Sequence, residues 1–99
     1  MDLDNYDGYQ TFTLSLQQTQ VIATSSKVKT IVVFYQHNGN TVFFVLDAQS
    51  QTGSGVSCNS AEFVPAYYNN LISNVGNNSF TFTNYFSPTL TFHLWYFCD

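Results

Sequence analysis

The acidic residues at the start of the chain have the types and spacing of a calcium-binding loop. Asp2, Asp4 and Asp7 stand close together, and a glycine follows them directly. Calcium prefers carboxylate oxygens as ligands, and a glycine permits the sharp turn that such loops need. The pattern lacks the closing glutamate of a calcium loop, so an acidic, turn-rich lead-in over residues 1–8 is the competing interpretation. We expect no cofactor other than a Ca2+ ion at this one candidate site.

A second group of residues has the chemistry of a binding surface. Trp95 lies near the end of the chain, with His93 and Phe97 at the adjacent alternate positions, and Phe34 and Phe43 stand in an earlier apolar region. Flat aromatic rings stack on the CH face of sugars and also bind apolar protein surfaces. The alternative is that these rings belong to the interior, because aromatic residues make up 18% of this small domain.

The sequence contains no pattern that is typical of an enzyme. His37 and His93 have no acidic or nucleophilic neighbour at a recognisable spacing, and Glu62 is the only glutamate. Ser54 is flanked by glycines, but the wider spacing of a nucleophile elbow is missing. We therefore expect a protein without catalytic activity.

The cysteines and a sequon favour an extracellular location. Cys58 and Cys98 are the only cysteines, and charged residues make up only 8% of the chain. An even pair of cysteines in an extracellular protein predicts one disulfide, with two buried free thiols as the alternative. Asn77 begins an Asn-Asn-Ser sequon and is a candidate glycosylation site. We expect a secreted or cell-surface protein.

The charge balance argues against nucleic acids as partners. Lys27 and Lys29 are the only cations, arginine is absent, and the formal net charge is −4. Binding to a phosphate backbone needs clustered basic side chains. No apolar run reaches the roughly 18–20 residues of a membrane-spanning helix. We therefore expect neither nucleic-acid binding nor membrane insertion.

A β-hairpin over residues 27–47 must position the central rings. Asn38-Gly39 separates two runs of β-branched and aromatic residues, which predicts a two-residue type I′ turn. Both faces of this hairpin are apolar in the middle, and this is typical of strands inside a sheet. The implied cross-strand pairs are Thr30–Asp47, Ile31–Leu46, Val32–Val45, Val33–Phe44, Phe34–Phe43, Tyr35–Val42, Gln36–Thr41 and His37–Asn40.

Two further strands are predicted before the hairpin. From Tyr9 onwards apolar residues alternate with polar ones, as in a half-buried strand. The buried side of this strand is predicted to hold Phe12, Leu14 and Leu16. A shorter strand is predicted over residues 19–24, with Val21 and Ile22 as candidates for burial.

The segments after the hairpin are less uniform. Residues 47–60 predict one long loop, because they are rich in Ser, Gly and Gln. Residues 65–75 have apolar residues at a helical period, and a helix beginning at Pro65 is the favoured interpretation there. The helical stripe would consist of Tyr68, Leu71, Ile72 and Val75. A strand over 62–68 is the alternative.

Two strands are predicted at the end of the chain. Residues 79–86 alternate so that Phe80 and Phe82 would be buried, and residues 89–98 alternate in the same way. The buried side of the second strand is predicted to hold Leu90, Phe92, Leu94 and Tyr96.

Five to seven short strands separated by turns predict an all-β fold. We expect a single antiparallel β-sandwich domain over residues 1–99, with a small β-barrel as the alternative. The favoured function is a recognition module that binds protein or glycan through aromatic and amide side chains, as in cell adhesion. One alternative is a coat, matrix or adhesin subunit that forms an oligomer through a sheet face. The other is a carrier of a small apolar ligand.

Overall fold

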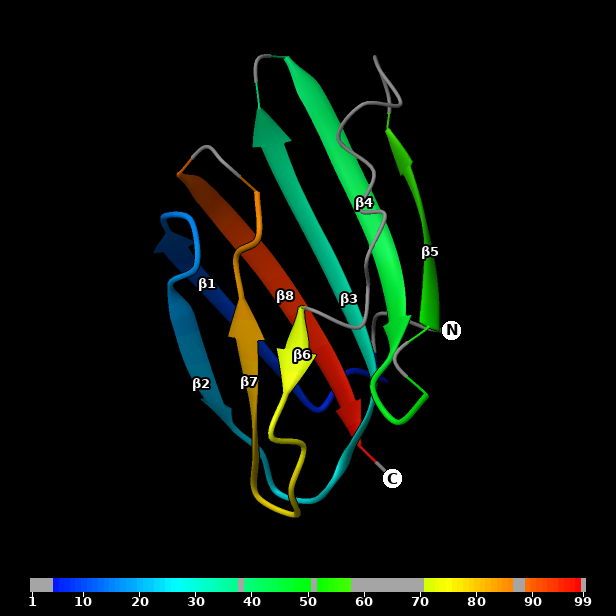
Figure 1. The fold of residues 1–99 in the computed structure, drawn as a ribbon. Coiled ribbons are helices and arrows are strands. Elements are labelled where there is room, and N and C mark those ends of the chain that lie inside the picture. The colour runs from blue at the N-terminus through cyan, green and yellow to red at the C-terminus, as the bar shows by residue number, and fades with distance from the viewer. Residues whose placement is uncertain (1–4, 38, 51, 58–70, 87–88, 99) are drawn as a thin grey trace.

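A computed structural model describes residues 5–37, 39–50, 52–57, 71–86 and 89–98. Within these ranges the chain forms eight strands and no helix, and the strands make two antiparallel sheets (Figure 1). The predicted β-sandwich is confirmed, with eight described strands instead of the five to seven expected, and neither sheet closes into a barrel. In the described part of the chain, no helix has the length and apolar character that would be needed to cross a membrane.

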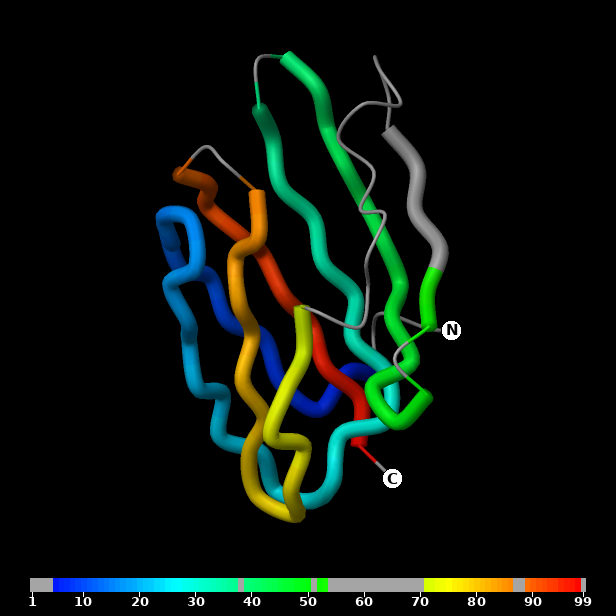
Figure 2. Tube along the Cα trace, viewed as in Figure 1, coloured from blue at the N-terminus to red at the C-terminus, as the bar shows by residue number. Residues whose placement is uncertain are grey.

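The two sheets differ in size. Sheet A has five strands in the order β1-β8-β3-β4-β5, and sheet B has three in the order β2-β7-β6. The strands of sheet A are β1 (Gly8–Leu14), β8 (Leu90–Cys98), β3 (Val28–His37), β4 (Asn40–Asp47) and β5 (Thr52–Ser57). Those of sheet B are β2 (Thr19–Ala23), β7 (Ser79–Thr83) and β6 (Ile72–Ser73). The chain passes from one sheet to the other between β1 and β2 and returns between β2 and β3 (Figure 2).

The β3–β4 hairpin has the predicted register over all eight residue pairs. Gly39 has a φ of +79°, the left-handed value that the turn requires of it, while Asn38 lies outside the described residues. β3 is flanked by β8 and β4, so the hairpin lies inside sheet A. The alternation of apolar residues together with the turn was therefore sufficient to set the register.

The core lies between the sheets. Phe80 and Phe82 of β7 are fully buried, as predicted, and belong to one core cluster with Phe92 and Leu94 of β8. The Phe82 and Phe92 rings meet edge to face, with their centroids 4.8 Å apart. Buried aromatic rings supply much of the apolar area that stabilises a domain of this size.

The long loop predicted over residues 47–60 is wrong in its described part. The chain turns at 48–50, and β5 then pairs with β4. The Asp47 carboxylate accepts hydrogen bonds from the backbone N–H groups of Gln49 and Ser50, each at 2.9 Å, which stabilises this turn. Gly and Ser have low strand propensity, but β4 offers a backbone edge with which they can pair.

The helix predicted over residues 65–75 is also wrong where the structure describes it. Ile72–Ser73 forms β6, and the N–H of Thr83 donates to the carbonyl of Leu71 across the strands at 2.9 Å. Asn74 has a φ of +52°, which no right-handed helix contains. Leu71 and Ile72 are buried all the same, so the apolar positions serve a strand instead. Residues 58–70, which include the alternative strand over 62–68, lie outside the described residues.

Two residues predicted to be buried are exposed. β1 ends at Leu14, and Leu16 lies in the following turn with 47% of its surface exposed. In β2 only Ile22 is buried, while Val21 is 62% exposed. Successive residues of a strand point to opposite faces, so Val21 and Ile22 could not both face the core.

Candidate functional site

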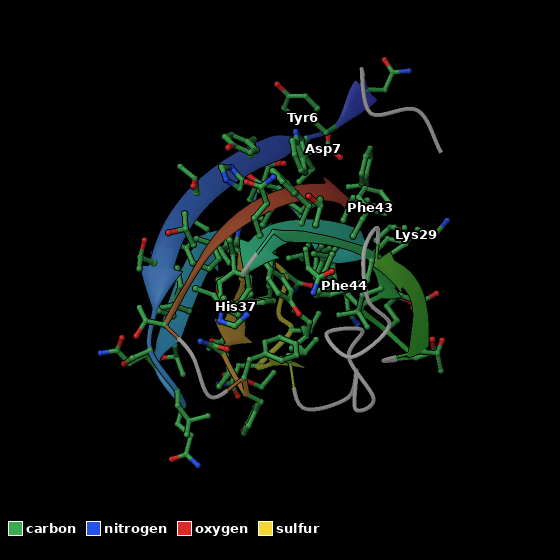
Figure 3. The ribbon with its side chains drawn as sticks, turned by 90° about the horizontal axis from the view of Figure 1, so that it is seen from above. Tyr6, Asp7, Lys29, His37, Phe43 and Phe44 are labelled. Carbon is green, nitrogen blue, oxygen red and sulfur yellow. The ribbon has the colours of Figure 1, made fainter. Side chains whose placement is uncertain are left out.

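Sheet A carries aromatic side chains on the side that faces away from sheet B. The strand register places Tyr9 of β1 beside Trp95 of β8, and His93 of β8 beside Phe34 of β3. Phe34 in turn lies beside Phe43 of β4. Phe43 and the core residue Phe44 lie on opposite sides of the arched sheet (Figure 3). We call the outer side chains the aromatic face; its members are Tyr9, Phe34, Phe43, His93 and Trp95.

Four of these rings contact one another. The rings of Phe34 and His93 are stacked, with centroids 4.5 Å apart and planes 23° apart. Tyr9 lies against Trp95 at 4.9 Å, and its hydroxyl forms a 2.8 Å hydrogen bond with Nδ1 of His93. The Phe34 and Trp95 rings are stacked at 6.2 Å. These contacts join β1, β8 and β3 into one continuous apolar surface.

The aromatic face is partly open to solvent. Tyr9 is 41% exposed and Phe43 is 36% exposed, whereas Phe34, His93 and Trp95 are half-buried. Val32 lies on this outer side beside Trp95 and is nevertheless fully buried. It does not belong to the core between the sheets. The aromatic face is therefore an apolar cluster separate from that core.

The stacking of Phe34 on His93 determines which ring surfaces remain available. Nearly parallel rings with centroids 4.5 Å apart overlap face to face, because rings lying side by side in one plane would collide at that distance. One face of each ring is thus covered by the other. The most exposed rings are those of Tyr9 and Phe43.

The aromatic face has different surroundings at its two ends. At one end the hydroxyls of Thr13 and Thr91 are hydrogen-bonded at 2.8 Å, and Gln36 Nε2 donates to Thr41 Oγ1 at 3.1 Å. The other end carries charge, including the exposed carboxylate of Asp47. The centre contains no formally charged residue, so contacts there must be apolar or made through hydroxyl and ring groups.

The acidic start of the chain has a structural role at Asp7. Its carboxylate accepts a hydrogen bond from the N–H of Cys98 at 2.7 Å, and its own N–H donates to the carbonyl of Tyr96 at 2.9 Å. These bonds attach the lead-in to the end of β8. Asp2 and Asp4 lie outside the described residues. Within the described ranges no three His, Cys, Asp or Glu side chains are grouped as metal ligands, and the Ca2+ site stays a prediction.

Of the remaining predicted site residues, Asn77 and Cys98 belong to the described part of the chain. Asn77 is exposed in the loop that joins β6 to β7 of sheet B. Cys98 is partly buried at the end of β8 and has no disulfide partner in the described part of the chain, to which Cys58 does not belong. Ser54 lies in β5 rather than in a loop, and Glu62 falls outside the described residues.

The structure brings together four of the five residues that the sequence predicted for binding. Phe34, Phe43, His93 and Trp95 share the outer side of sheet A; Phe97 lies on the same side of β8, opposite Thr30, and makes no ring contact with the described residues. Sequence reasoning missed Tyr9. Tyr9 lies beside Trp95 because β1 pairs with β8, which is at the far end of the chain. The only signal in the sequence was that Tyr9 and Phe12 are three residues apart, so that they point to opposite sides of the strand.

No known protein family, curated protein or solved structure matches this chain. What the protein does is therefore inferred from the geometry of its described residues.

Proposed function

We propose that the chain is a secreted or cell-surface recognition module without catalytic activity that binds a protein partner through its aromatic face. The observation that supports this proposal is the partly exposed ring cluster on the outer side of sheet A. These rings are not part of the core between the sheets. Contiguous apolar surface on a folded domain usually marks an interaction site. Tyr and Trp are also enriched at the energetic centres of protein interfaces.

The ring geometry favours a protein partner over a glycan. A sugar stacks on a free ring face, but Phe34 and His93 cover one another. Sheet A also arches over the core, so that its outer side is convex (Figure 3). A convex, uncharged surface fits an apolar groove on a partner, whose hydrogen-bonding groups would meet the Tyr9 hydroxyl and the threonines at its end.

The extracellular part of the proposal rests on composition. Only 8% of the residues are charged, and the chain has one pair of cysteines and a sequon. The exposure of Asn77 in the β6–β7 loop is compatible with a glycan there. Such a glycan would leave the outer side of sheet A uncovered, because the loop belongs to sheet B.

Trp95 is the only tryptophan and provides an internal reporter for the test. The folded chain is screened against an array of extracellular protein domains and, separately, an array of glycans. Each hit is then titrated while Trp95 emission is recorded. We expect a protein hit that shifts this emission and binds at least tenfold more weakly to Phe43→Gln. Val21→Gln is the control, since Val21 is an exposed apolar residue on sheet B, with 62% of its surface exposed against 36% for Phe43.

Two results would contradict the proposal. Protein hits that bind Phe43→Gln as tightly as the wild type would place the interface elsewhere. Glycan hits that shift Trp95 emission and depend on Phe43, without any protein hit, would replace the protein partner by a carbohydrate.

A further inference from the structure

We propose that the open edge of β1 pairs with β1 of a second copy of the chain, which joins the two five-stranded sheets into one. This backbone edge adjoins the aromatic face, to which Tyr9 of β1 contributes, and its pairing goes beyond the proposed function. β1 is the terminal strand of sheet A, and among the described residues only β8 pairs with it. In an antiparallel strand alternate residues direct their N–H and C=O groups away from the partner strand. The outer edge of β1 therefore offers a row of backbone donors and acceptors.

β1 lacks the features that usually protect an edge strand. Its sequence, GYQTFTL, contains no Lys, Glu, Asp or Pro. Its register with β8 is continuous from Gly8 to Leu14, without a bulge that would turn the edge away. Natural proteins use charges, prolines and bulges to prevent edge-to-edge association. Their absence over seven consecutive residues leaves this edge able to accept another strand.

The other edge strands are less suitable. β2 has five residues and β6 has two, which limits the number of hydrogen bonds that each can offer. β5 contains two glycines, at positions 53 and 55, which weaken strand pairing. β1 is the longest edge strand of the described part, and it alternates polar and apolar residues throughout.

The composition of β1 fits pairing with itself. A twofold axis at Thr11 would place Thr11 opposite its own copy, Tyr9 opposite Thr13, and Gln10 opposite Phe12. Like charges directly opposite one another are destabilising, and this strand contains none. Threonine pairs across strands form favourable contacts. Most soluble oligomers are symmetric, and the commonest are twofold dimers, in which the same surface of each copy meets the other.

The shape of sheet A favours the edge over the face for contact between copies. The outer side is convex, so two copies meeting face to face would touch over a small area (Figure 3). Pairing through β1 avoids this restriction, since strands join side by side about 4.8 Å apart. It would also bring the two Tyr9 side chains to the same outer surface.

The test compares two variants that introduce a lysine on different edge strands. Thr11→Lys places two like charges opposite one another at the centre of the β1 pair, and Val21→Lys places a lysine in the middle of β2. Both side chains are exposed, so both variants should fold, and circular dichroism verifies this. In sedimentation velocity over a concentration series, we expect the wild type and Val21→Lys to dimerise. Thr11→Lys should raise the dissociation constant at least tenfold.

Amide hydrogen exchange at low and high protein concentration provides a second measurement. We expect exchange to slow with concentration in β1 and to stay constant in β5. A wild type that remains monomeric at the highest concentration would overturn the inference, and so would a dimer that survives Thr11→Lys or is lost in Val21→Lys. Phe43→Gln should dimerise normally, because β8 and β3 separate its strand from β1. The experiment thus distinguishes a failure of the proposed β1 dimer from a failure of the proposed binding through the aromatic face.

Discussion

Gly8 lies directly opposite Tyr96 in the β1–β8 pair, and the Tyr96 ring occupies the space that a Cβ atom at position 8 would need. The ring is held there by an edge-to-face contact with Phe80 at 6.0 Å. Its hydroxyl donates a hydrogen bond to the carbonyl of Ala23 at 3.2 Å. Burial also raises the pKa of Tyr96 above its ordinary value of 10.0, so this donor stays protonated at neutral pH. The glycine thus permits a contact that links sheet A to sheet B.

We predict that Gly8→Ala lowers the free energy of unfolding by about 1–3 kcal/mol, because the Tyr96 ring must move and lose its contacts. Urea denaturation measures the change. Gly76→Ala is the control and should change stability by less than about 0.5 kcal/mol, since a Cβ there meets only the Ser79 carbonyl at 3.9 Å. In a Tyr96→Ala background the cost of Gly8→Ala should disappear. If the cost persists in that background, the clash with Tyr96 is not its cause.

The left-handed conformation of Gly39 gives a second prediction. A Cβ at this position meets nothing within 4 Å, so a substitution changes only the backbone strain. We expect Gly39→Val to destabilise the domain by about 1–3 kcal/mol, because a β-branched residue is strained at positive φ. Gly39→Asn should cost clearly less, since asparagine tolerates this conformation. Equal stability of the two variants in denaturant titration would contradict the explanation by backbone strain at position 39.

The ionised carboxylate of Asp47 makes the stability of the folded chain depend on pH in the acidic range. Hydrogen bonds from the backbone N–H groups of Ser50 and Gln49 lower the pKa of Asp47 below its ordinary value of 3.8. Its stabilising contribution is therefore complete above the pKa of the unfolded chain and is lost as the pH falls through the lower folded pKa. We predict that the wild type is more stable than Asp47→Ala at pH ~6 and that this difference shrinks below pH ~4. Urea titrations at several pH values test this, and a difference that grows on acidification would refute it.

The predicted disulfide between Cys58 and Cys98 can be tested by mass. We expect no alkylation of the unfolded, unreduced chain and uptake of two alkyl groups after reduction. Closing a loop of this length should contribute roughly 3–4.5 kcal/mol to stability on the chain-entropy model. Reduction should therefore lower the denaturation midpoint. Two alkyl groups without reductant would show free thiols and remove one support for an extracellular location.

The sequence by itself determined the centre of the fold. Around Asn38-Gly39 the turn chemistry and the two-residue period agree, and the whole β3–β4 register follows from neighbouring residues. The burial of Phe80, Phe82, Phe92 and Leu94 follows in the same way from strict alternation. These features are local, because a hairpin and an alternating strand need no information from distant parts of the chain.

Where local preference was weak, tertiary pairing decided the structure. β5 exists because β4 offers it a backbone edge, although its Gly and Ser residues favour a loop. Ile72 lies in a strand rather than a helix because β7 lies alongside and Asn74 takes a left-handed conformation. Leu16 is exposed because β1 ends two residues earlier, at a turn that the alternation did not indicate.

The aromatic face shows both contributions. Trp95, His93, Phe34 and Phe43 were identifiable from their types and from the two-residue period of their strands. That they form one surface with Tyr9 was decided by the strand order β1-β8-β3-β4, which brings the two ends of the chain side by side. The Tyr9–His93 hydrogen bond joins residues 84 positions apart in the sequence. Sequence periodicity fixes which side of a strand a residue occupies, but only the folded sheet determines which strand lies next to it.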